Sequence, residues 1–72
     1  MEKYKFWDIF QENADGALSP RQRINVNGVI FGPGVAFGPG VAFGGLNFHN
    51  YKNLDIAGEK QNDILVIKGF YQ

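Results

Sequence analysis

Residues 31–42 read Phe31-Gly32-Pro33-Gly34-Val35-Ala36-Phe37-Gly38-Pro39-Gly40-Val41-Ala42, which is one hexad repeated without change. A third, altered hexad follows as Phe43-Gly44-Gly45-Leu46-Asn47-Phe48. Proline fixes its own φ at about −65°, and the glycine after it can adopt the positive φ that a type II turn requires at its third residue. We therefore predict type II turns at residues 32–35 and 38–41, with Gly34 and Gly40 at positive φ.

The segment between these turns is too short for the strands of ordinary hairpins, which usually run about 5–6 residues. Equal turns at equal short intervals predict a chain that coils, with the first and fifth residues of each hexad pointing inward. Those residues are our candidate core or self-association site: Phe31, Val35, Phe37, Val41 and Phe43.

The hexads resemble the hexapeptide repeat of left-handed parallel β-helices, in which an apolar residue and Gly precede two variable positions, a small residue or Val, and one more residue. In that family three hexads form one triangular coil, and many members are trimeric acyltransferases. The resemblance covers about one coil, a quarter of the chain, and it implies a β-helix-like segment over residues 31–48. The chain departs from the family by placing Phe where the family prefers aliphatic residues. Solenoids generally need about three stacked units, so flanking hairpins or further copies of the chain must cover the coil.

The sequence on either side of the repeat predicts hairpins. Residues 4–10 are rich in aromatic side chains without a helix N-cap, which favours a strand. Asn13-Ala14-Asp15-Gly16 predicts a turn. Asn27-Gly28 lies between alternating residues and predicts a two-residue hairpin turn. Residues 54–57 and 64–67 predict a second hairpin with its turn near residues 60–63 and its second strand at about 63–71.

These elements predict a small all-β domain over residues 1–72. Its parts are an N-terminal hairpin region at 3–30, the hexapeptide-repeat coil at 31–48 and a C-terminal hairpin at 49–72. A chain of 72 residues buries only about 60% of its unfolded surface. It also has no cysteine to supplement the core. The composition of seven Phe, three Tyr and one Trp indicates aromatic packing or oligomerisation as the remaining support.

Charge places further limits on function. The formal net charge is zero, which argues against a nucleic-acid partner, because such proteins need a basic face. All charged residues lie in the flanks, and none occurs between Ile24 and Tyr51. The prolines and glycines of this uncharged stretch argue against a membrane span. The first residues lack the apolar run of a signal peptide, so we expect a cytoplasmic protein.

Residues that carry chemistry are few. His49 is the one histidine. Hexapeptide acyltransferases that use a histidine as general base hold it between coils at a subunit interface. The resemblance therefore implies His49 as a candidate general base. No nucleophile or phosphate-binding loop accompanies it. An exposed turn histidine is the plainer interpretation, and we expect no enzymatic activity and no cofactor.

Residues 11–22 resemble a decayed EF-hand loop, with Asn13, Asp15, Gly16, Leu18 and Ser19 in register. Gln11 and Gln22 replace the acidic residues at its two ends, which removes most of the charge that holds Ca²⁺. An ordinary Asp-Gly turn is the preferred interpretation, and we expect no metal. Gly-Pro-Gly-Val also resembles elastin-like and silk-like segments, which leaves a disordered repeat as an alternative.

Two functions remain open. The first is a structural or interaction module that forms homo-oligomers, or binds a protein partner, through its uncharged Gly/Phe/Val surface, because exposed apolar patches usually mark interfaces. The alternative is a small-ligand or peptide-binding module in which Trp7, Tyr51 and Tyr71 form an aromatic groove. Simple core packing is the competing explanation for those three aromatics.

Overall fold

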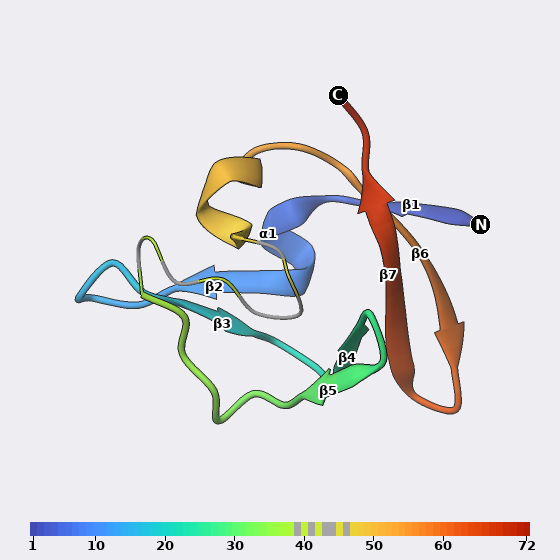
Figure 1. The fold of residues 1–72 in the computed structure, drawn as a ribbon, viewed down its shortest axis with the longest axis horizontal. Coiled ribbons are helices and arrows are strands. Elements are labelled where there is room, and N and C mark those ends of the chain that lie inside the picture. The colour runs from blue at the N-terminus through green and yellow to red at the C-terminus, as the bar shows by residue number, and fades with distance from the viewer. Residues whose placement is uncertain (39, 41, 43–44, 46) are drawn as a thin grey trace.

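Seven strands and two short helices make up the described part of the chain (Figure 1). The computed structural model describes residues 1–38, 40, 42, 45 and 47–72. Its elements are β1 (Glu2–Tyr4), α1 (Phe6–Ile9), β2 (Phe10–Glu12), β3 (Leu18–Pro20), β4 (Ile24–Val26), β5 (Val29–Phe31), the 3-10 helix η1 (Phe48–Tyr51), β6 (Ile56–Gln61) and β7 (Ile64–Phe70). This content confirms the predicted all-β class. No helix of these residues is long and apolar enough to cross a membrane.

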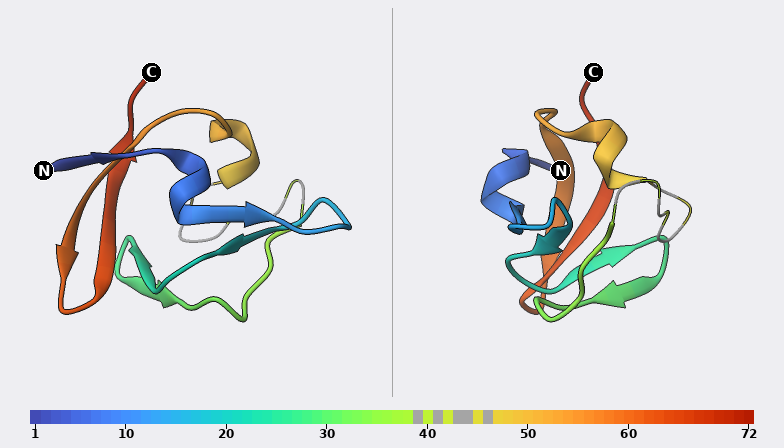
Figure 2. Two further views of the ribbon diagram at one scale, coloured as in Figure 1. Left: turned by 180° about the vertical axis from the view of Figure 1, so that it is seen from behind. Right: turned by 90° about the vertical axis from the view of Figure 1, so that its left-hand side faces the viewer.

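The main sheet has five strands in the order β1-β6-β7-β4-β5. All neighbours are antiparallel except β4 and β7, which run parallel with Ile24 opposite Leu65. A separate antiparallel pair joins β2 to β3. Figures 1 and 2 show α1, η1 and the β2–β3 pair on one side of the β6–β7 hairpin.

The core lies between these two layers and is dominated by aromatic rings. Consecutive ring centroids lie 4.8 Å apart for Phe6 and Phe10, 5.0 Å for Phe10 and Phe48, 5.3 Å for Phe48 and Phe37, and 5.3 Å for Phe37 and Phe31. This ring row therefore runs from α1 to β5. The main sheet contributes the aliphatic residues that face it: Ile24, Val26, Ile56, Leu65 and Ile67.

The structure has an antiparallel hairpin at the Asn27-Gly28 turn and another in the C-terminal part of the chain. Asn27 and Gly28 have φ of 51° and 88°, as a type I′ turn requires, and they join β4 to β5. Asn62 and Asp63 likewise have positive φ and join β6 to β7. The first strand of this second hairpin begins at Ile56, two positions later than predicted. The turn over residues 13–16 also forms, although it closes a separate hairpin of β2 and β3.

The strand predicted over residues 4–10 is wrong, because residues 6–9 form one helical turn. That turn buries three residues with helical spacing, Phe6, Ile9 and Phe10, and leaves Trp7 and Asp8 exposed. A strand would have sent neighbouring apolar residues to opposite faces. The guanidinium of Arg21 closes the turn, since its Nε donates to the carbonyl oxygens of Trp7 and Phe10 at 3.0 and 3.1 Å.

The first corner of the repeat also differs from the prediction. The amide of Val35 donates to the carbonyl of Gly32 at 3.2 Å, so residues 32–35 do form a turn. Gly34 is not among the residues with positive φ, which excludes the type II geometry there. Gly40 has φ of 81° as predicted, while Pro39 and Val41 lie outside the described residues. The full coil therefore remains a prediction.

Candidate association surface

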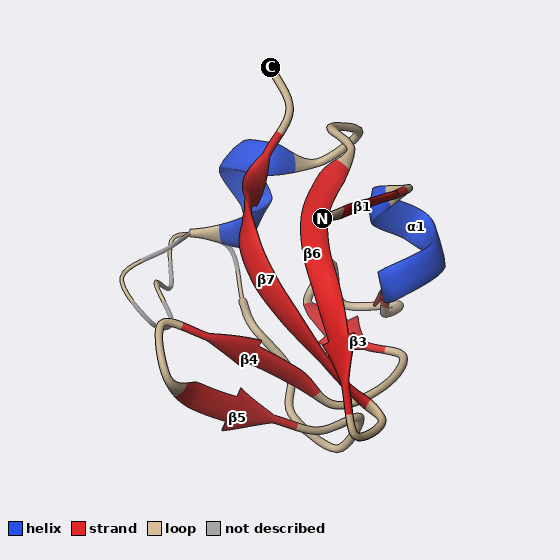
Figure 3. Ribbon diagram, turned by 90° about the vertical axis from the view of Figure 1, so that its right-hand side faces the viewer, coloured by secondary structure: helices blue, strands red, loops and turns tan. Residues whose placement is uncertain are grey.

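The β5 strand forms one border of the main sheet, at the opposite end from β1 (Figure 3). It pairs on one side with β4, with Val26 opposite Val29 and Ile24 opposite Phe31. The two-residue turn before it fixes this register. Asn25 supports the turn, because its Oδ1 accepts a 2.9 Å hydrogen bond from the amide of Gly28.

The side chains of β5 alternate between the two faces of the sheet. Val29 and Phe31 lie on the face of the buried residues Val26 and Ile24, whereas Ile30 lies opposite Asn25 on the outer face. Val29 is nevertheless 46% exposed and Ile30 is 55% exposed. The border thus presents two large aliphatic side chains to water.

The β5 border lacks the features by which proteins usually protect sheet edges. Such edges carry charged side chains, prolines or bulges that discourage pairing with another chain. β5 contains neither a charge nor a proline, and the uncharged stretch extends from Ile24 to Tyr51. Its pairing with β4 is regular. We call the border formed by Val29, Ile30 and Phe31 the β5 edge.

Three of the residues predicted to face inward are described by the structure, and all three contact the core. Phe37 is fully buried, and its backbone exchanges hydrogen bonds with Leu18 at 2.7 and 2.9 Å. Phe31 and Val35 are half-buried and pack against the core. Phe37 is therefore a core residue rather than part of an exposed surface. Val41 and Phe43 lie outside the described residues.

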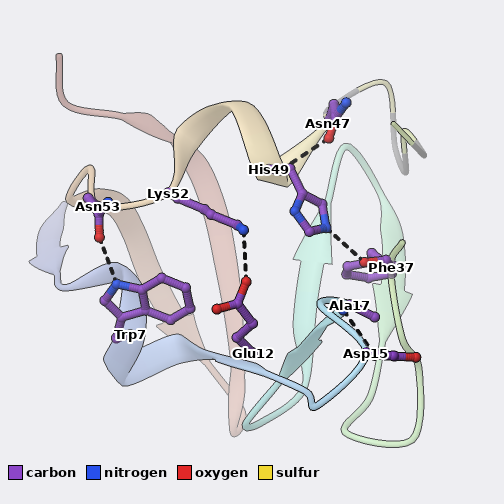
Figure 4. Close-up of polar contacts among 9 residues, drawn as sticks. All are labelled: Trp7, Glu12, Asp15, Ala17, Phe37, Asn47, His49, Lys52 and Asn53. Carbon is purple, nitrogen blue, oxygen red and sulfur yellow. Dashed lines mark hydrogen bonds and ion pairs between the residues drawn. The ribbon is translucent and has the colours of Figure 1, made fainter. Parts of the chain in front are cut away.

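His49 joins η1 to the repeat (Figure 4). Its Nε2 lies 2.9 Å from the carbonyl oxygen of Phe37, so this nitrogen carries the proton and donates. The His49 amide donates to Oδ1 of Asn47 at 3.1 Å, which caps η1. Both contacts connect parts of the fold, and they make His49 a half-buried bridging residue rather than the exposed turn residue that we expected.

The three aromatics of the alternative function make separate contacts. The Trp7 indole donates to Oδ1 of Asn53 at 2.8 Å (Figure 4), Tyr51 stacks on Phe70 at 4.4 Å, and the Tyr71 ring lies 4.8 Å from the Lys3 ammonium. No pocket is found among the residues that the structure describes. The geometry therefore gives this alternative no specific support.

In the EF-hand-like segment, polar side chains form hydrogen bonds within the segment itself. The amide of Ala17 donates to Oδ1 of Asp15 at 3.0 Å (Figure 4), and the Asn13 amide group donates to Ser19 Oγ at 2.9 Å. Within the described ranges, no three His, Cys, Asp or Glu side chains gather in a way that could hold a metal ion. The Asp15 carboxylate thus acts as an Asx-turn acceptor.

Comparisons with protein-family models, curated proteins and solved structures give no match for this chain. The β5 edge is therefore the candidate functional site of this chain. Sequence reasoning placed residues 29–31 in a strand but did not select Val29 and Ile30 as surface residues. The available signal was the absence of charge on both sides of Asn27-Gly28.

Proposed function

We propose that this chain is a non-enzymatic structural or interaction module that self-associates through the β5 edge. One observation carries the proposal: an uncharged border strand exposes Val29 and Ile30 to water. Exposed apolar surface and unpaired strand edges both favour association. The proposal keeps the predicted role of the uncharged segment. The proposed contact is now on β5 and not on the side chain of Phe37, which is buried.

The size of the domain supports the same conclusion. A 72-residue chain has a limited core of its own, and this one has no cysteine for a disulfide. Covering the β5 edge adds apolar burial that the isolated chain cannot supply. An uncharged contact surface also lets identical copies approach without juxtaposing like charges.

Sedimentation velocity across a concentration series tests the proposal. We expect the mass of the natural chain to rise with concentration from that of a monomer. The Ile30→Lys variant should remain a monomer, because it places a charge on the edge. Gln61→Lys is the matched control, since it adds the same charge at an exposed position away from β5 and should behave as the natural chain.

Two results would contradict the proposal. If the natural chain remains monomeric at the highest concentration, the proposed self-association is wrong. If Ile30→Lys associates as strongly as the natural chain, the contact lies on a surface other than the β5 edge. Circular dichroism of each variant confirms that the fold is intact, which the exposure of Ile30 leads us to expect.

A further inference from the structure

The backbone of Ile30 is oriented away from β4. In a two-residue hairpin the residues that flank the turn, here Val26 and Val29, form a hydrogen-bonded pair, and such pairs alternate with non-hydrogen-bonded ones along the ladder. The pair of Asn25 and Ile30 is therefore of the second kind. The amide and carbonyl of Ile30 point outward, and within the described part of the chain they meet no backbone partner on that side.

Glycines lie two positions before and two positions after Ile30. A Cβ added to Gly28 or to Gly32 would meet no atom within 4 Å, so both positions are open. Gly28 belongs to the turn before β5, where its φ is 88° and its amide donates to Asn25 Oδ1. Gly32 follows β5, and its carbonyl accepts from the amide of Val35. The outward-facing backbone amide and carbonyl of β5 are therefore those of Ile30. The edge thus consists of one outward-facing residue between two positions without side chains, where another backbone can approach closely.

We infer that a second copy of this chain pairs antiparallel with β5, with Ile30 opposite Ile30 of the second copy. This inference rests on the proposed self-association and specifies its geometry. The two Ile30 residues exchange N–H···O=C bonds in both directions. The same register sets Gly28 opposite Gly32 of the second copy, and it joins the two sheets into one continuous sheet across the interface.

The register also pairs the side chains favourably. Val29 lies opposite Phe31 of the second copy, and the two-fold symmetry produces this pair twice. Aromatic and β-branched residues form stabilising cross-strand pairs, and a non-hydrogen-bonded pair such as this one brings the side chains closest. In this register the exposed surface of Val29 meets the half-buried ring of Phe31 of the second copy.

Several features favour a copy of this chain over a different peptide. An antiparallel pairing centred on one residue is self-complementary, so it closes into a dimer and leaves no further edge of this kind open. Neither copy brings a charge to the contact, since residues 24–51 have none. A charged partner segment would find no opposite charge on this edge with which to pair.

Single-cysteine cross-linking tests the register, because the natural chain has no cysteine. The Cα atoms of directly opposite residues in a hydrogen-bonded pair lie about 5.5 Å apart, within the range of a disulfide. We expect Ile30→Cys to form a covalent dimer in a glutathione redox buffer. The yield should be at least about tenfold above that of Val29→Cys, whose equivalent residues lie diagonally at about 7–8 Å.

Lys3→Cys on the opposite border measures cross-linking by random collision, since Lys3 is also exposed. A Val29→Cys yield that equals or exceeds that of Ile30→Cys overturns the register. All three variants can also give low yields while the natural chain associates in sedimentation. That result overturns the backbone pairing of β5, and self-association then stands or falls with the Ile30→Lys comparison. A natural trimer, as the hexapeptide resemblance implies, overturns the two-fold arrangement in the same way. A natural chain that stays monomeric removes the proposed function and this inference together.

Discussion

The five-stranded sheet ends in two borders of opposite character. At β1, Glu2 and Lys3 are exposed and charged, the Lys3 ammonium lies 3.7 Å from Asp55, and the N-terminal ammonium lies 3.9 Å from Glu59. At β5 the exposed residues are Val29 and Ile30. Exposed ion pairs add little to stability, so the charges of β1 matter chiefly because a second chain would have to displace them from water. One border therefore carries exposed charges, and the other exposes uncharged aliphatic side chains.

The β5 edge depends on the core that packs against it, and the buried side chain of Phe37 is part of that core. Phe37→Ala is therefore expected to have the largest effect on stability. Phe37 is fully buried in the ring row between Phe48 and Phe31. We expect its truncation to lower the free energy of unfolding by about 3–5 kcal/mol, as measured by urea unfolding followed through Trp7 fluorescence. Phe31→Ala is the matched control and should cost less, because Phe31 is only half-buried. If both variants lose the same free energy of unfolding, the deeper burial of Phe37 adds no stability beyond that of Phe31.

Lys3→Val is a direct attempt to abolish the difference between the borders. Removing the charge from β1 should create a second apolar edge, so that the weight-average mass at high concentration exceeds that of a dimer. Lys68→Val is the matched control, since Lys68 is exposed on the interior strand β7 and carries the same charge. We expect it to associate as the natural chain does. If both variants give the same mass, the charge at β1 does not protect that border.

The smallest effect concerns the charged border alone. The Tyr4 hydroxyl donates a 2.5 Å hydrogen bond to Glu2, and this bond, with smaller contributions from desolvation and the carboxylate charge, raises the pKa of Tyr4 above 10.0. Glu2→Gln should return that pKa toward its ordinary value, as measured by following the tyrosine ring signals by NMR through alkaline pH. A Tyr4 pKa that does not change in this variant would show that the bond is absent in solution.

The direction of the accompanying stability effect follows from linkage. A pKa raised by folding means that the folded state favours the protonated phenol. The small stabilisation from Tyr4 is therefore fully present below the unfolded pKa of about 10. It is lost as the pH rises through the folded value. Tyr4→Phe should remove this part of the alkaline pH dependence and slightly lower the stability at neutral pH, because the hydrogen bond to Glu2 is lost.

Local signals predicted part of this fold. Asn27-Gly28 specified a hairpin because positive φ at two successive residues suits few other turns, and residues 64–67 specified a strand by their β-branched composition. The helical turn at residues 6–9 was missed because its stabilisation is tertiary: Phe6 and Ile9 enter the core together, while Lys5 gives no side-chain cap.

The candidate surface depended on pairing that a single sequence does not reveal. Residues 29–31 are a border strand because β7, about forty residues away, occupies the other side of β4. Had another segment paired with β5, the same Val29 and Ile30 would have been buried. In the same way, Phe37 became a core residue through its bridge to Leu18, a contact that the hexad period does not encode.

The parallel pairing of β4 with β7 has a consequence for the order in which the chain can fold. The β4–β5 hairpin is local and can form early, but β4 gains its second neighbour only when residues 64–70 are present. Contacts between such distant segments form slowly, because a long loop must close first. During synthesis, the uncharged stretch is therefore complete while β4 still lacks its inner neighbour, and both sides of the hairpin are then open to other chains. The rate of association during refolding should accordingly exceed that of the native protein.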